Sequence, residues 1–199
     1  SHLYLSEKGD SSFSPTYTGE GVSLRTGFIQ VEEGLSPSSV INTNGATATR
    51  GADSLINVGR ADLFNSVEGV IEIEMAALVN GGVSREVLMW DGSDTDFRIR
   101  MFYLPAVNEF GVIVVVGGVT VYTYSGDIGN QTEMNNFKFK YKENDFGLKI
   151  NNIEVDSQSS GSSFPSGKIS TLDFSAAFGA SPMYAKIKSV IIHKDTTNY

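Results

Sequence analysis

Apolar and polar residues alternate over much of the chain, and this period of two is typical of β-strands with one buried face. The clearest case runs VIEIEM from Val70 to Met75. Residues 137–142 alternate aromatic residues with lysines, which predicts rings buried on one face and ammonium groups in water on the other. The expected strands are 27–32, 48–57, 69–78, 86–90, 97–103, 110–116, 119–124, 137–142, 145–150, 153–155 and 185–193.

Turn residues separate these segments. Asn80-Gly81-Gly82 predicts a hairpin, and Asn151-Asn152 predicts a two-residue turn because Asn tolerates the left-handed conformation. A helical turn is expected only at 61–65. Short strands at a spacing of about 8–12 residues, without longer helices, predict an all-β fold, an antiparallel β-sandwich or barrel.

The run GVIVVVGGVT, from Gly111 to Thr120, is too uniformly apolar for a half-exposed strand. Two explanations are open: a strand buried on both faces within the domain, or a surface covered by another copy of the chain.

Composition excludes several classes of function. The chain has 199 residues, of which 40% are hydrophobic and 19% charged, as in ordinary folded proteins. Its net charge of −8 argues against binding to nucleic acid, which needs clustered Lys and Arg, and against binding to an anionic membrane surface. There is no cysteine, so disulfides and thiolate zinc sites are impossible. No apolar run approaches the roughly 20 residues of a membrane span.

The segment from Gln30 to Asp53 resembles a junction that is common in bacteriophage tail and virion proteins, where it leads into a concanavalin A-like (laminin G-like) jelly roll. The matching positions in the junction are Gln30, Glu32, Gly34, Gly45, Ala46, Thr49, Arg50, Ala52 and Asp53. Further similarities extend to His193. They are Phe64-Asn65, 68–71 with Val70 where Thr is usual, the hairpin 141–155 with Asn152 where Gly is usual, and the closing strand 186–192.

The resemblance implies a strand and linker segment at 1–39, belonging to a preceding region, and a jelly-roll domain at 40–199. It also implies a non-catalytic structural module of a phage tail fibre or virion protein that binds host-surface carbohydrate. The implied partners are host-surface polysaccharide and other domains or copies of the same protein, including a homotrimer. The implied location is the virion tail or the extracellular space. Two alternatives are open: a polysaccharide-degrading glycoside hydrolase or lyase, and a purely architectural domain.

The candidate carbohydrate-binding residues are Trp90, Asp91, Arg98 and Tyr103. Carbohydrate recognition needs an exposed aromatic ring beside planar polar groups, and Trp90 is the only tryptophan of the chain. The competing interpretation makes Trp90 a core residue at a strand end.

Arg98 and Arg100 share a strand face, so they either face water or pair with Glu72 and Glu74 on a neighbouring strand.

Asp91, Asp94 and Asp96 place three carboxylates in one loop, which makes the loop a candidate calcium site. The alternative is an ordinary hairpin loop.

The catalytic inventory is sparse. Glu72 and Glu74 lie two residues apart on one strand face, a spacing that could suit a retaining glycosidase, but no aromatic residue is near them to stack on a sugar. The alternative is a solvated polar face. A lyase base would come from the tyrosines at 103, 122 and 124 or from His193.

Overall fold

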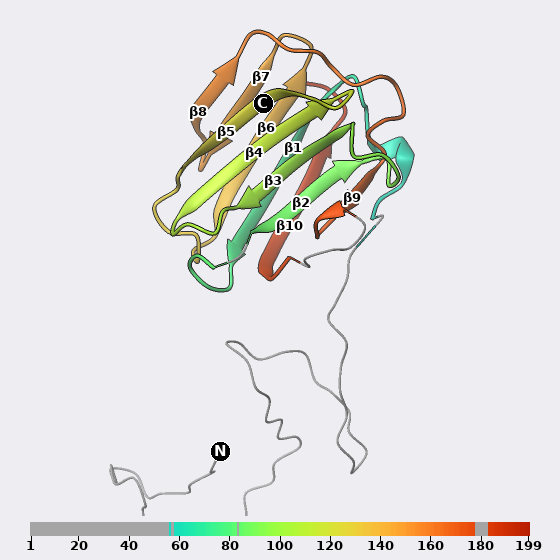
Figure 1. Ribbon diagram of the computed structural model, residues 1–199. Coiled ribbons are helices and arrows are strands. Elements are labelled where there is room, and N and C mark those ends of the chain that lie inside the picture. Colours follow the sequence, from blue (N-terminus) through green and yellow to red (C-terminus); the bar gives the residue numbers. More distant parts are fainter. Residues whose placement is uncertain (1–55, 57, 83, 178–182) are drawn as a thin grey trace, which may run out of the picture. The chain divides into compact units, whose positions relative to one another are not determined.

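The computed structural model describes residues 56, 58–82, 84–177 and 183–199, all within the compact unit Gly51–Tyr199 (Figure 1). The predicted strand at 27–32, nearly all of the strand predicted at 48–57, the junction Gln30–Asp53 and the boundary near residue 40 lie outside the described residues. The N-terminal segment 1–39 therefore stays a prediction.

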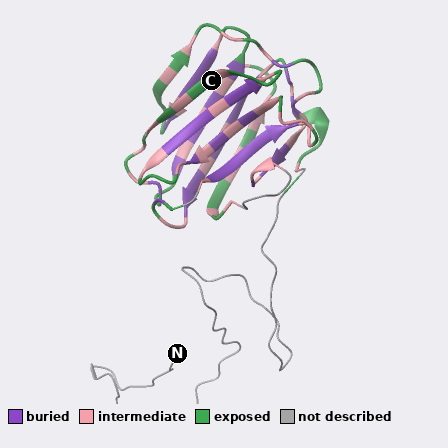
Figure 2. Cartoon of the chain, viewed as in Figure 1, coloured by how far each residue is buried: buried purple, intermediate pink, exposed green. Residues whose placement is uncertain are grey.

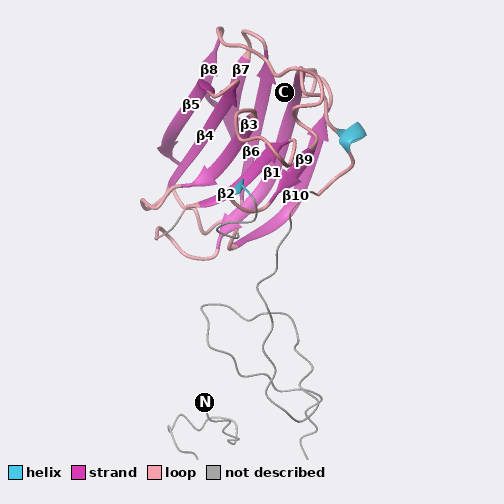
Figure 3. Ribbon diagram, turned by 45° about the vertical axis from the view of Figure 1, so that its right-hand side comes forward, coloured by secondary structure: helices cyan, strands magenta, loops and turns pink. Residues whose placement is uncertain are grey.

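The described residues form two antiparallel five-stranded sheets (Figures 1 and 3). The front sheet, which is nearer the viewer in Figure 1, has the order β5-β4-β3-β2-β9, and the back sheet has the order β10-β1-β6-β7-β8. One 3-10 turn, η1, falls within the predicted 61–65. The elements are η1 (Ala61–Leu63), β1 (Glu68–Ala77), β2 (Arg85–Trp90), β3 (Arg98–Tyr103), β4 (Glu109–Val116), β5 (Val119–Asp127), β6 (Asn135–Lys142), β7 (Phe146–Ile150), β8 (Ile153–Gln158), β9 (Thr171–Asp173) and β10 (Ala185–His193). The prediction of an all-β antiparallel sandwich is confirmed.

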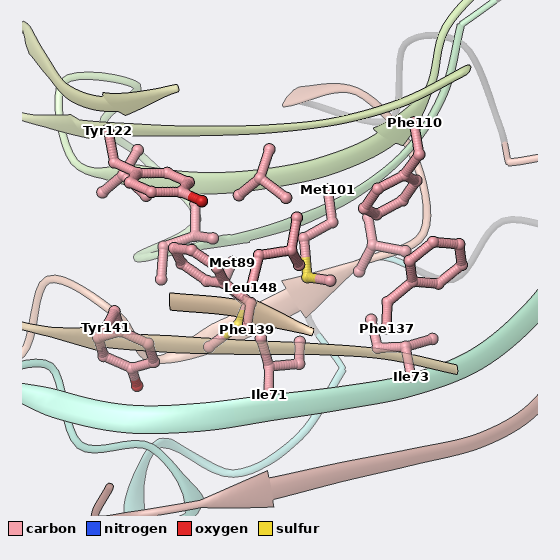
Figure 4. Close-up of a cluster of buried hydrophobic side chains, with 14 of the residues drawn as sticks. Ile71, Ile73, Met89, Met101, Phe110, Tyr122, Phe137, Phe139, Tyr141 and Leu148 are labelled. Atoms are coloured by element: carbon pink, nitrogen blue, oxygen red, sulfur yellow. The ribbon is translucent and has the colours of Figure 1, made fainter. Parts of the chain in front are cut away.

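Side chains from both sheets meet between the layers, as Figure 4 shows. In β6 the alternation is as predicted: Phe137, Phe139 and Tyr141 are buried between the sheets. The ring of Phe110 from the front sheet stacks on Phe137 from the back sheet, with centroids 3.8 Å apart. This aromatic contact joins the two layers within the core.

The predicted hairpin at Asn80-Gly81-Gly82 is wrong. β1 pairs with β6 and β10, whereas β2 pairs with β3 and β9, so the segment between β1 and β2 crosses from one sheet to the other. Gly81 and Gly82 both have positive φ, as a tight reversal requires, and the N–H of Gly82 donates to the carbonyl of Pro105. A local turn signal shows that the chain reverses, but not which sheet the next strand joins.

Other local predictions are confirmed. Asn151 and Asn152 have φ of 53° and 65° and connect β7 to β8 as a two-residue turn. The apolar run of β4 lies between β3 and β5, and its Val112 and Val114 point into the core. Val119, near the end of the run, is 63% exposed, so burial within the domain accounts for only part of the run. Figure 2 shows how strongly burial gathers along β2 and β4 of the front sheet. No helix of the described residues is long and apolar enough to cross a membrane.

Candidate functional site

The structure buries both aromatic residues of the predicted carbohydrate site. Tyr103 is 0% exposed, lies in the core and donates its hydroxyl to the carbonyl of Met75 at 3.0 Å. Trp90 is 1% exposed, and its indole N–H donates to Oδ2 of Asp173 at 3.0 Å. Neither ring offers a face to a sugar, so the expected stacking platform is not formed by Trp90.

The loop with the three aspartates is held together by hydrogen bonds and by a lysine. Oδ1 of Asp91 accepts bonds from the N–H groups of Ser93 and Asp94, and these bonds lower the pKa of Asp91 although its partial burial alone would raise it. The ammonium of Lys168 lies 3.2 Å from Asp91 Oδ2 and 3.4 Å from Asp94 Oδ2. Lys168 thus supplies the positive charge that a calcium ion would bring.

The calcium prediction for Asp91, Asp94 and Asp96 therefore gains no support. No group of three or more His, Cys, Asp or Glu side chains in the described ranges is arranged to hold a metal ion. The loop is adequately explained as a hairpin connection between β2 and β3, the alternative stated for it above.

Arg98, Arg100 and Phe102 share the outward face of the front sheet. Their neighbours Ile99, Met101 and Tyr103 point into the core, so the alternation of β3 fixes this placement. The Nε and Nη2 groups of Arg100 both donate to Oε2 of Glu86, at 2.9 Å for Nε. The same guanidinium lies 4.9 Å from the ring centroid of Phe102.

The ring of Phe102 lies against Gly111 of the neighbouring strand β4. A Cβ at position 111 would approach Cζ of Phe102 to 2.9 Å, closer than real Cβ contacts allow. The absence of a side chain at Gly111 is therefore what lets the ring lie close to the sheet. The apolar ring in this position is partly exposed and lies beside the guanidinium of Arg100.

Arg98 keeps most of its hydrogen-bonding capacity. Its Nη1 donates to the carbonyl of Thr95, and no carboxylate among the described residues forms an ion pair with it. Partial burial and the nearby charge of Arg100 lower its pKa, but a guanidinium stays charged at neutral pH. A guanidinium has five N–H donors, so Arg98 can bind a planar or anionic group.

The predicted pairing of Arg98 and Arg100 with Glu72 and Glu74 is wrong, because β3 and β1 belong to different sheets. Glu72 pairs with Lys138 at 3.0 Å, and Glu74 pairs with Lys188 at 2.8 Å. Partial burial would raise the pKa of Glu72, but hydrogen bonds from Asn136 and Lys138 outweigh it and lower that pKa. A glycosidase acid needs a raised pKa, so this carboxylate has the opposite of the required property.

The other catalytic candidates are also poorly placed. Burial raises the pKa of Tyr103 and Tyr122, which opposes a role as a base. A shallow pocket of about 320 Å³ lies beside η1 and includes Phe64, Asn65 and Lys194 in its lining. Its lining contains no Asp, Glu or His, and Lys194 is the only titratable side chain among its lining residues.

The arrangement on the front sheet includes residues that sequence reasoning missed. Glu86, Phe102, Gly111 and Lys168 were not among the candidates. Phe102 could have been found, because it lies four positions after Arg98 on a strand and so shares its face. Glu86 and Lys168 contact the site across strands and loops, and no local pattern indicates such contacts.

Comparison with known proteins supports the fold. No protein-family model matches the chain, and no curated protein matches it. Among solved structures, the chain is similar to a K499G mutant of NanB sialidase from Streptococcus pneumoniae, at 16% identity and a TM-score of 0.53. The alignment covers 68% of this chain and 23% of the sialidase, so the chain spans about a quarter of that protein.

Two smaller proteins are also similar. The CBM40 of Ruminococcus gnavus IT-sialidase bound to α2,3 sialyllactose matches at 11% identity and a TM-score of 0.48, over 65% of this chain and 76% of that one. Sheep galectin-11 in complex with glycerol matches at 14% identity and a TM-score of 0.41, over 70% and 94%. At these identities the similarity shows the fold alone.

Proposed function

We propose that this domain is a non-catalytic carbohydrate-binding module and that it binds glycans on the outward face of the front sheet. The observation that carries the proposal is the partly exposed Phe102 ring lying beside Arg100, with Arg98 further along the same strand face. Carbohydrate sites commonly combine an apolar surface with a few polar groups that fix orientation. This face of β3 supplies both.

We further propose that the module belongs to a phage tail fibre or related virion protein and recognises host-surface polysaccharide. This part rests on the resemblance of Gln30–Asp53 to a virion-protein junction. Weak binding at each site would suit a protein present in several copies, because multivalency raises the overall affinity.

The test is calorimetric titration of the whole chain with three polysaccharides: neutral dextran, polygalacturonate and polysialic acid. Products of the same samples are analysed for new reducing ends and unsaturated sugars. We expect saturable heat with at least one probe and no cleavage products. Arg98→Ala should weaken binding at least about tenfold, because it removes the donors that are free for a ligand.

The matched control is Arg60→Ala. Arg60 is an exposed arginine that pairs with Asp62, close to η1 and on no strand of the front sheet. The Arg60→Ala variant should bind the polysaccharides with the affinity of the wild type. Cleavage products would overturn the non-catalytic assignment in favour of a hydrolase or lyase. Equal losses of affinity in Arg98→Ala and Arg60→Ala would favour an architectural domain. So would the absence of binding heat with all three polysaccharides.

A further inference from the structure

The back sheet ends in two strands that each have one partner. Among the described residues, β8 pairs only with β7, and β10 pairs only with β1. The outer edges of β8 and β10 therefore carry backbone N–H and C=O groups that are free to pair with another strand.

Both edge strands expose aliphatic side chains. On β8, Ile153 is 68% exposed and Val155 39%. On β10, Ile187 is 36% exposed and Ile191 45%. Exposed apolar residues along an unpaired edge favour the addition of a further strand, which would bury them.

The charges of the two edges are opposite. β8 carries Glu154 and Asp156 and no Lys or Arg, whereas β10 carries Lys186 and Lys188 and no Asp or Glu. Lysines on an edge strand normally oppose pairing. Pairing β10 with a second β10 would bring lysines together, and pairing β8 with a second β8 would bring carboxylates together. Pairing β8 with β10 instead brings acidic and basic side chains together.

We propose that a second copy of this chain binds head-to-tail, with β8 of one copy pairing with β10 of the next. Four antiparallel steps separate the two edges, so β8 and β10 run in the same direction (Figure 1). When two copies lie side by side in the same orientation, β8 of one copy and β10 of the next are therefore parallel. Their pairing joins the two back sheets into one continuous sheet. Repeating one such step gives a closed ring, of which a trimer is one case, or a filament.

The residues chosen for a test are Glu154 and Lys186. Neither forms an ion pair with a described residue, whereas Lys188 pairs with Glu74. Glu154 lies near the hydroxyl of Tyr199 and, after burial, contributes to the raised pKa of that tyrosine. The whole chain and the variants Glu154→Lys and Lys186→Glu are compared by sedimentation velocity over a wide range of protein concentrations. We expect the wild type to associate reversibly. Each charge reversal should raise the dissociation constant about tenfold, because attraction at the interface becomes repulsion.

The decisive sample is an equimolar mixture of the two variants. In the mixture, the lysine introduced at position 154 of one variant meets the glutamate introduced at position 186 of the other. A head-to-tail interface then regains opposite charges, and association should recover. Both positions are exposed, so we expect each variant to keep the fold. Thermal unfolding of each variant checks this. A wild type that is monomeric at every concentration, or a mixture that stays dissociated, would overturn the proposal.

Discussion

The two outward faces of the sandwich differ in how their charges are used. On the back sheet, the three glutamates of β1 each pair with a lysine: Glu68 with Lys142, Glu72 with Lys138 and Glu74 with Lys188. On the front sheet, Glu86 binds Arg100, while Arg98 has only a backbone carbonyl as its described partner. The glutamates of β1 on the back sheet are thus neutralised by lysines, whereas Arg98 on the front sheet keeps guanidinium donors free for a ligand.

The two faces also share a device. Phe102 lies against Gly111 on the front sheet, and Tyr199 lies against Gly147 on the back sheet. The Tyr199 ring is contacted by the ammonium groups of Lys140 and Lys149, at 4.6 and 4.1 Å from its centroid. The same ring-on-glycine packing thus serves an internal contact of the chain on one face and a proposed ligand site on the other.

The largest expected effect on stability comes from a substitution in the core between the two sheets. Phe137→Ala removes the ring that stacks on Phe110 and leaves a cavity between the sheets. We expect a loss of about 3–5 kcal/mol in the free energy of unfolding. Urea denaturation measures it, with the exposed Tyr184→Ala as control. A loss as small as that of the control would show that the two sheets do not depend on this contact.

An intermediate effect separates the two faces. Gly111→Ala and Gly147→Ala each place a Cβ within 3 Å of an aromatic ring, 2.9 Å from Cζ of Phe102 and 2.8 Å from Cζ of Tyr199. Both should lower stability by about 1–3 kcal/mol, because the ring has to move. Only Gly111→Ala should also weaken glycan binding in calorimetry. Equal binding by both variants would remove Phe102 from the proposed site.

The smallest effect is a pH dependence on the back sheet. The pKa of Glu72 is lowered from its ordinary value of 4.5, so its ion pair stabilises the fold above that pH. This contribution is lost as the pH falls below 4.5 through the folded-state pKa. Glu72→Gln should therefore lose less stability than the wild type between neutral and acidic pH. If the melting temperatures of Glu72→Gln and the wild type changed equally with pH, this account would be contradicted.

The strands could be predicted from sequence wherever alternation is long enough, as in 137–142. β9 has only three residues, too few for a pattern, and its place in the front sheet depends on pairing with β2. The sheet to which each strand belongs was not predictable either, because Asn80-Gly81-Gly82 has the same local chemistry in a hairpin and in a crossover.

The candidate site was predicted only in part, through Arg98. The burial of Tyr103 follows from the sequence, since it shares a strand face with Ile99 and Met101. The burial of Trp90 does not, because its hydrogen-bond partner Asp173 lies 83 residues further along the chain. Contacts of that range depend on the complete topology, which local periodicity does not contain.

The pairing of β1 with β10 has a consequence for synthesis of the protein. Ile71 lies opposite Ile192 in this pair, so a strand made early needs a neighbour made about 120 residues later. On the ribosome, the back sheet cannot be completed until residues 185–193 have left the exit tunnel. Until then β1 lacks one of its two neighbours, and the emerging chain has to be kept from binding other chains through that open edge.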